Sequence, residues 1–155
     1  MTEEKPGRIP VGRPVGLRFD HETKRSLDLM AAQFGRRRVG AVLRVAARRL
    51  VAQPEGIGNA LAEQRRLSRD RTPAVYHVRI NVHLDEDLLD TLDTIGARVG
   101  ADRVELMRLA VKRVLSDPGM LEEAVNREIF RSEKNKTQLL RRHARLQERR
   151  RTQLD

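Results

Sequence analysis

The chain has 155 residues, which is enough for one medium-sized domain or two very small ones. Its 32 Lys and Arg outnumber 22 Asp and Glu, and the net charge of +10 favours a polyanionic partner, either nucleic acid or an acidic membrane surface. The absence of Cys excludes disulfides and thiolate metal sites, and the 3% aromatic content argues against stacking on single-stranded nucleic acid. No apolar run approaches the roughly 18 residues of a membrane span, and residues 1–7 lack the apolar stretch of a secretory signal. We therefore expect a cytoplasmic protein that binds duplex DNA.

The first part of the chain predicts an arm, a strand and two helices. Residues 1–12 combine Pro and Gly with mixed charge and are interpreted as a flexible arm. A short strand is predicted from Pro14 to Phe19, where apolar residues take alternate positions. Asp20 is a suitable N-cap for a first helix, which Gly35 is expected to end in a left-handed conformation. A second helix is predicted from about Val39 to Val51 by its apolar stripe.

A linker and a second strand follow. Residues 54–73 are rich in Gly, Arg and Gln and are interpreted as a linker with a short helix at 60–67. The stretch His77–Leu84 alternates strictly between apolar and polar residues, which is typical of a half-buried strand. Its polar face consists of His77, Arg79, Asn81 and His83. The carboxylates of residues 85–87 come directly afterwards, and we interpret them as favourable charges at a helix N-terminus rather than as metal ligands.

The second part of the chain repeats the first. A helix that Gly100 ends and another from about Arg103 to Leu115 take the places of the two earlier helices. Phe19 and Leu84 lie 65 positions apart, as do Leu27 and Leu92, and Gly35 and Gly100. Arg44 and Arg108 lie 64 positions apart, so the first unit has one extra residue between its helices. This regular offset indicates an internal duplication of a strand–helix–helix unit.

Residues 118–155 form a C-terminal extension. A helical pattern starts at about Met120, and beyond it residues 131–155 contain nine Lys and Arg against three acidic residues. This basic segment is predicted to be mostly helical or disordered. Two interpretations remain equal: a solvated helix, and an extension that binds nucleic acid or protein.

The duplication predicts how the two units assemble. A unit of about 40 residues buries too little surface to be stable alone, and a single strand leaves unpaired backbone groups at both edges. Antiparallel pairing of the two strands within one chain solves both problems. The predicted fold is mainly α, with a short two-stranded antiparallel β-ribbon on a four-helix core. Such a ribbon fits the major groove of B-DNA.

This pattern resembles the ribbon-helix-helix family of DNA-binding proteins. The second unit is similar through its strand and through the run Gly100–Val111, where Gly, a capping residue, Glu, two apolar residues, Arg and Ala recur in the family's order. The first unit matches more loosely, through Leu17–Asp20 and Leu43–Ala46. Two units in one polypeptide resemble the TraY-type accessory proteins of conjugative relaxosomes, and residues 126–131 look like the segment that follows the second unit there.

The resemblance covers roughly residues 13–131 and implies a tandem ribbon-helix-helix protein, a pseudo-dimer within one chain. Its units would be residues 13–53 and 74–117, forming one composite DNA-binding domain from 13 to 117. The implied partners are double-stranded DNA at an origin of transfer, a relaxase and other relaxosome proteins. Several copies could assemble on one DNA site. Neither a membrane span nor a cofactor is expected.

The resemblance also implies which residues read DNA bases. In the second unit these are the outward-facing Arg79, Asn81 and His83, since Arg pairs with guanine and Asn with adenine through two hydrogen bonds each. The corresponding positions of the first unit hold Pro14, Gly16 and Arg18. Only Arg18 can read a base there, while Gly16 would let the backbone approach the DNA closely. We therefore expect an asymmetric binding site.

Phosphate contacts are expected at the N-termini of the two second helices, where free backbone N–H groups point outward. The residues concerned are Arg36, Arg37, Arg38 and Val39 in the first unit, and Arg103 and Val104 in the second. Asp102, the expected N-cap of the latter helix, is a mild objection because of its negative charge.

No catalytic or metal-binding residue is expected. The histidines at 21, 77, 83 and 143 lack metal-ligand spacing, and the single tyrosine, Tyr76, has no histidine metal cluster to support relaxase chemistry. Two alternatives to a relaxosome factor remain: a transcriptional repressor or autoregulator of the same family, and an antitoxin whose C-terminal extension binds a toxin.

Overall fold

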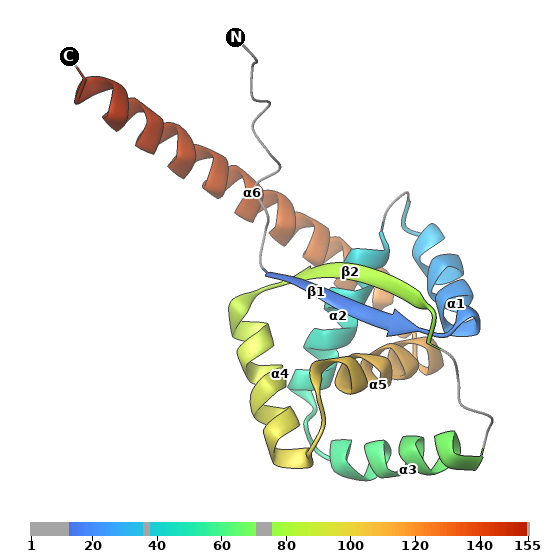
Figure 1. The fold of residues 1–155 in the computed structure, drawn as a ribbon. Helices are drawn as coiled ribbons and strands as arrows, with labels where there is room; N and C mark the ends of the chain where they lie inside the picture. The colour runs from blue at the N-terminus through green and yellow to red at the C-terminus, as the bar shows by residue number, and fades with distance from the viewer. Residues whose placement is uncertain (1–12, 36–37, 71–75, 155) are drawn as a thin grey trace.

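The computed structural model describes residues 13–35, 38–70 and 76–154 and is mainly helical with one two-stranded antiparallel sheet. The elements in chain order are β1 (Arg13–Phe19), α1 (His21–Ala32), α2 (Val39–Ala52), α3 (Ile57–Asp70), β2 (Val78–Leu84), α4 (Glu86–Val99), α5 (Arg103–Ser116) and α6 (Leu121–Thr152) (Figure 1). The predicted arm at 1–12 and residues 71–75, which include the end of the predicted linker, lie outside the described residues. The expectation of a mainly α protein with a short ribbon is confirmed at this level.

The two strands pair within the single chain, as expected. Val15 lies opposite Val82, Leu17 opposite Ile80, and Phe19 opposite Val78. Leu17 and Phe19 are almost fully buried, whereas their neighbours in β1 are exposed, so the side chains alternate between the core and solvent. The strand β2 begins at Val78, one residue later than predicted, and His77 precedes it.

The helices α2 and α5 form the centre of the core beneath the ribbon. They pack against each other, and each also contacts the first helix of the other unit, so the two units share one core. Leu43 and Leu50 of α2 and Leu106 and Met107 of α5 are all at most 1% exposed. Burying a side chain of this size contributes about 1.5–3 kcal/mol, so each of these four stabilises the core substantially.

The helix ends follow the predicted capping residues, with one exception. Asp20 accepts a hydrogen bond from the backbone N–H of Thr23 at 2.6 Å, and Asp102 accepts one from Glu105 at 2.9 Å. Gly100 ends α4 with a φ of +69°, a left-handed conformation that disfavours any residue with a Cβ. Gly35 also has a positive φ of +111°, but α1 already ends at Ala32, so Gly35 turns the chain beyond the helix instead of capping it.

The helix within the predicted linker is longer than expected and belongs to the core. It runs from Ile57 to Asp70 and buries Ile57 and Leu61, while α3 packs against α5. The predicted short helix at 60–67 included the buried Leu61 but missed Ile57 and the last turn. Residues 57–70 thus connect the two units and also stabilise the second one.

The helices α3 and α6 occupy corresponding positions in the chain. Ile57 and Leu61 of α3 lie 64 positions before Leu121 and Val125 of α6, and all four side chains are buried. The residue before each helix has a left-handed backbone, since Gly56 has a φ of +75° and Met120 one of +57°. The α6 helix packs against α2, and α3 against α5, so each third helix contacts the central helix of the other unit.

The described part of the chain contains no helix that is both long and apolar enough to cross a membrane.

Candidate functional site

The exposed face of the ribbon brings together all the expected base-reading residues. The register places Pro14 opposite His83, Gly16 opposite Asn81, and Arg18 opposite Arg79. Of the residues expected to read bases, His83 is partly buried and the other four are exposed. They form one continuous surface, because directly opposed residues in an antiparallel pair point to the same side of the sheet.

Gly16 makes room for the guanidinium group of Arg79. A Cβ atom at position 16 would lie only 3.1 Å from Nη2 and 3.2 Å from Nε of Arg79. The Nε atom of Arg79 also donates a hydrogen bond to Oδ1 of Asn81 at 3.3 Å. The guanidinium group of Arg79 thus lies over the backbone at Gly16, where we expected DNA to approach closely. Gly16 and Asn81 together orient the arginine across the ribbon.

The exposed face of the ribbon carries unbalanced positive charge. Arg18 and Arg79 are directly opposite each other, an arrangement that is destabilising for like charges. Neither strand contains an acidic residue. The nearest ion pair of the ribbon lies at its end, where Arg13 is 3.0 Å from Glu86. Such a face is stabilised when an anion neutralises the two arginines.

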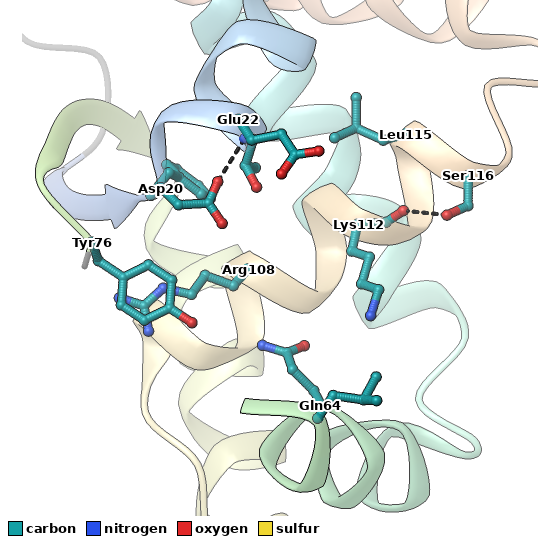
Figure 2. Close-up of a pocket in the computed structure, with 11 residues that line it drawn as sticks. Asp20, Glu22, Gln64, Tyr76, Arg108, Lys112, Leu115 and Ser116 are labelled. Carbon is teal, nitrogen blue, oxygen red and sulfur yellow. Dashed lines mark hydrogen bonds between the residues drawn. The ribbon is translucent and has the colours of Figure 1, made fainter. Parts of the chain in front are cut away.

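At the other end of the ribbon, Arg108 ties α5 to β1. Its Nε donates a hydrogen bond to the backbone carbonyl of Arg18 at 2.9 Å, and its guanidinium carbon lies 3.6 Å from the ring centroid of Tyr76. Figure 2 shows Arg108 against the ring of Tyr76. The two side chains line a pocket of about 450 Å³ together with Lys112 of α5 and Gln64 of α3. Neither Tyr76 nor Arg108 was predicted to support the ribbon, although the offset of 64 between Arg44 and Arg108 had indicated equivalent arginines in the two units.

A buried ionic cluster holds α6 against α2. Glu128 is only 4% exposed, and its carboxylate accepts a hydrogen bond from Nε of Arg48 and lies 3.8 Å from Nε of Arg44. Arg48 also donates to Asp85 at 2.5 Å. Burial lowers the pKa of Arg44, whereas at Arg48 the effect of burial is outweighed by hydrogen bonds to Asp85 and Glu128, which raise its pKa.

The carboxylates at the start of α4 lie at the helix N-terminus, as expected, and two of them also contact arginines. Asp85 is the N-cap residue by position, but its side chain makes no capping hydrogen bond and instead accepts from Arg48. Glu86 pairs with Arg13. The expected favourable charge in the first helical turn therefore rests on Glu86 and Asp87. No group of three or more His, Asp or Glu side chains that could hold a metal ion occurs among the described residues.

The two expected phosphate-binding helix ends differ from each other. At the start of α2, Arg38 is the N-cap residue and Val39 the first helical residue, while Arg36 and Arg37 lie outside the described residues. At the start of α5, Arg103 donates two hydrogen bonds of 2.6 Å each to Asp93, and Val104 is partly buried.

The charge at the start of α5 is largely compensated. The hydrogen bond between Arg103 and Asp93 raises the pKa of the arginine and lowers that of the carboxylate. Asp102 caps the helix, and Glu105 pairs with Arg65 at 2.9 Å. Three carboxylates thus surround this helix start, which disfavours the phosphate contact expected there.

Comparison with protein-family models, with curated proteins and with solved structures finds no match to this chain. The functional interpretation therefore rests on the ribbon, its charges and the internal duplication.

Proposed function

We propose that this chain is a sequence-specific DNA-binding protein that reads the major groove of duplex DNA with the β1–β2 ribbon. One observation carries the proposal: Arg18 and Arg79 are directly opposed on an exposed face that has Asn81 and His83 but no carboxylate. Folding alone disfavours this arrangement, since like charges face each other and neither arginine forms an ion pair with a carboxylate in the described part of the chain. A polyanion supplies the missing negative charge, and a two-stranded ribbon fits the major groove.

The proposed readers act through their hydrogen-bonding groups. Arg79 donates two hydrogen bonds to O6 and N7 of a guanine, and Asn81 pairs with N6 and N7 of an adenine. The bond between Arg79 and Asn81 is long, at 3.3 Å, so exchanging it for contacts with bases costs little. Arg18 reads from the opposite strand of the ribbon, and His83 contributes a donor or an acceptor according to its tautomer.

The two strands contribute unequally to the proposed readout. Opposite Asn81 and His83, β1 has Gly16 and Pro14, which offer no hydrogen-bonding side chain. The DNA site is therefore asymmetric, in contrast to the palindromes that symmetric dimers recognise.

We further propose a tandem ribbon-helix-helix architecture and, within it, the role of a relaxosome accessory factor. The duplication of a strand followed by two helices supports the architecture, and the presence of both units in one chain supports the comparison with TraY-type proteins. In that role the protein binds an origin of transfer and assists a relaxase there. A transcriptional repressor would use the same ribbon, so the bound DNA decides between the two roles.

Selection from a library of duplexes with a randomised central segment tests the proposed recognition. We expect the full chain to enrich one non-palindromic sequence, with a position that favours guanine and one that favours adenine. Failure to enrich any sequence would contradict sequence-specific binding. Footprinting on a transfer-origin fragment and on a promoter fragment from the same genetic element then separates the two roles, since a relaxosome factor protects the former preferentially.

A further inference from the structure

The α6 helix leaves the body of the molecule after its first turns. It has 32 residues, and its only buried side chains are Leu121, Val125 and Glu128. Beyond Glu128, none of the described side chains up to residue 154 is buried. At 1.5 Å per residue, the stretch from Glu128 to Thr152 is about 36 Å long. Figure 1 shows this stretch extending from the body, with α3 at the opposite side of the view.

This free part of α6, residues 132–152, is strongly basic. It contains eight Lys and Arg and two Glu. Within the described residues of this segment, no Lys or Arg forms a salt bridge with a described carboxylate. Arg141, Arg145 and Arg149 follow one another at a spacing of four, which places like charges next to each other and weakens an isolated helix.

The basic residues of α6 form a stripe along one side of the helix. Its members are Arg127, Arg131, Lys134, Arg141, Arg145 and Arg149. Successive members are three, four or seven positions apart, so they share one face. The buried residues Leu121 and Val125 lie on a different face, so the stripe points away from the contact with α2, and only Arg131 reaches its edge, where it lies 3.4 Å from Glu128.

We propose that this basic stripe is a second, sequence-independent contact to the phosphate backbone of duplex DNA. The inference rests on the proposed function, because it assigns α6 to the same DNA molecule that the ribbon reads. The buried cluster of Glu128, Arg44 and Arg48 fixes α6 to α2, which packs under the ribbon, and so sets the direction of the stripe relative to the ribbon. Duplex DNA has one negative charge per roughly 1.7 Å of its axis, which gives the stripe many phosphates to contact.

The apolar residues of α6 argue against other occupants. A helical protein partner needs apolar residues at heptad spacing over three or four heptads, but the free part has only Leu139 and Leu146 seven positions apart. Leu140 is 51% exposed and falls on another face. An anionic membrane would require a broad apolar face opposite the charges, which the free part also lacks.

Two triple variants with equal charge test the stripe. The first replaces Arg141, Arg145 and Arg149 by Gln, and the second replaces Lys136, Arg150 and Arg151, which lie off the stripe. Gln preserves helix propensity, and circular dichroism checks that both variants keep the helical content of the native chain. Fluorescence anisotropy then measures binding to the enriched duplex and to a duplex of scrambled sequence at a series of salt concentrations.

We expect the stripe variant to lose affinity for both duplexes by a similar factor, on the order of 10–100-fold. The slope of log K against log salt should fall by up to about 2.7, because each phosphate contact contributes about 0.9. The off-stripe variant should change the slope by less than half as much. If the two triple variants had equal effects, only the total charge of α6 would matter, and the proposal of a stripe would be wrong. If neither variant changed DNA binding, the proposed contact between α6 and DNA would be wrong.

This outcome is separable from that of the proposed function. If no sequence is enriched but the stripe variant still binds DNA more weakly, sequence-specific recognition fails and the α6 contact stands. If a sequence is enriched but the two triples behave alike, recognition stands and the α6 contact fails. Binding to vesicles with phosphatidylglycerol but not to the scrambled duplex would show that the stripe serves a membrane, and would also overturn the proposal.

Discussion

Replacing Glu128 by Gln should release α6 from the body of the protein. The carboxylate is 4% exposed and contacts Arg44 and Arg48, whose side chains are 21% and 29% exposed. Removing one partner of a buried ion pair costs about 3–5 kcal/mol, because the remaining charge stays buried without compensation. Arg48 keeps its bond to Asp85, and both arginines retain some contact with water. We therefore expect a loss at or just below the lower end of that range, about 2–3 kcal/mol.

Urea denaturation followed by circular dichroism measures this loss, and thermal unfolding should show a decrease in Tm of roughly 4–12 °C for a chain of this size. Glu122→Gln is the matched control, since Glu122 is an exposed carboxylate in the first turn of the same helix. It loses only its favourable interaction with the helix macrodipole, up to about 1 kcal/mol. If Glu128→Gln were no more destabilising than Glu122→Gln, the ionic cluster would not be what fixes α6.

Two further stability predictions concern the backbone and pH. Met120→Gly should stabilise the protein by about 0.5–1 kcal/mol, because the backbone at Met120 is left-handed and its side chain is exposed. Gly56→Ala at the equivalent, also left-handed position should destabilise the protein by about 1 kcal/mol. Urea titrations that gave the opposite signs would contradict the equivalence of the two positions. Because the pKa of Asp93 is lowered in the folded protein, the unfolded chain takes up a proton first as pH falls. The stabilisation from the bond with Arg103 is therefore fully present above about pH 5, begins to decrease near the ordinary Asp pKa of about 3.9, and is lost as pH falls through the lowered pKa of the folded state. Urea titrations at several pH values should show a shallower acid loss for Asp93→Asn, and an unchanged pH profile would refute this role.

The elements near the ribbon could be predicted because their signals are local. Alternation in β2 has a period of two residues and follows directly from one buried and one exposed face. The caps at Asp20 and Asp102 follow from a short acidic side chain placed three residues before a free backbone N–H. The constant offset between the units then predicted that the two strands pair with each other, since each strand covers the unpaired edge of the other.

The helices at 60–67 and from about Met120 were predicted, but their equivalence was not, although the signal was present. The offset of 64 that relates Arg44 to Arg108 also relates Ile57 to Leu121. Only a few apolar positions are shared beyond that point, and the polar character of residues 62–70 is typical of a linker. The local preference for helix is weak here, and α3 is stabilised mainly because it buries Ile57 and packs against α5.

Interactions between distant charges could not be predicted from the sequence at all. Arg48 and Glu128 are 80 positions apart, and no spacing rule connects them. Arg103 fits the pattern of a phosphate-binding residue at a helix start, but the fold brings Asp93 to within 2.6 Å of it. Likewise, the space above Gly16 becomes occupied only because the register places Arg79 beside it. Tertiary contacts therefore decide which of the arginines remain available to a ligand.

The most direct test of DNA reading by the ribbon is the Asn81→Ala variant, because Asn81 is neutral and its loss leaves the charge of the surface unchanged. Its matched control is Asn59→Ala, which removes an exposed asparagine from α3. Affinities for the enriched duplex and for a scrambled duplex are measured for both variants. We expect Asn81→Ala to weaken binding to the enriched duplex by about 1–3 kcal/mol and to leave binding to the scrambled duplex unchanged, while Asn59→Ala affects neither. Equal losses on the two duplexes, or no loss on the enriched one, would contradict the reading of DNA by this ribbon.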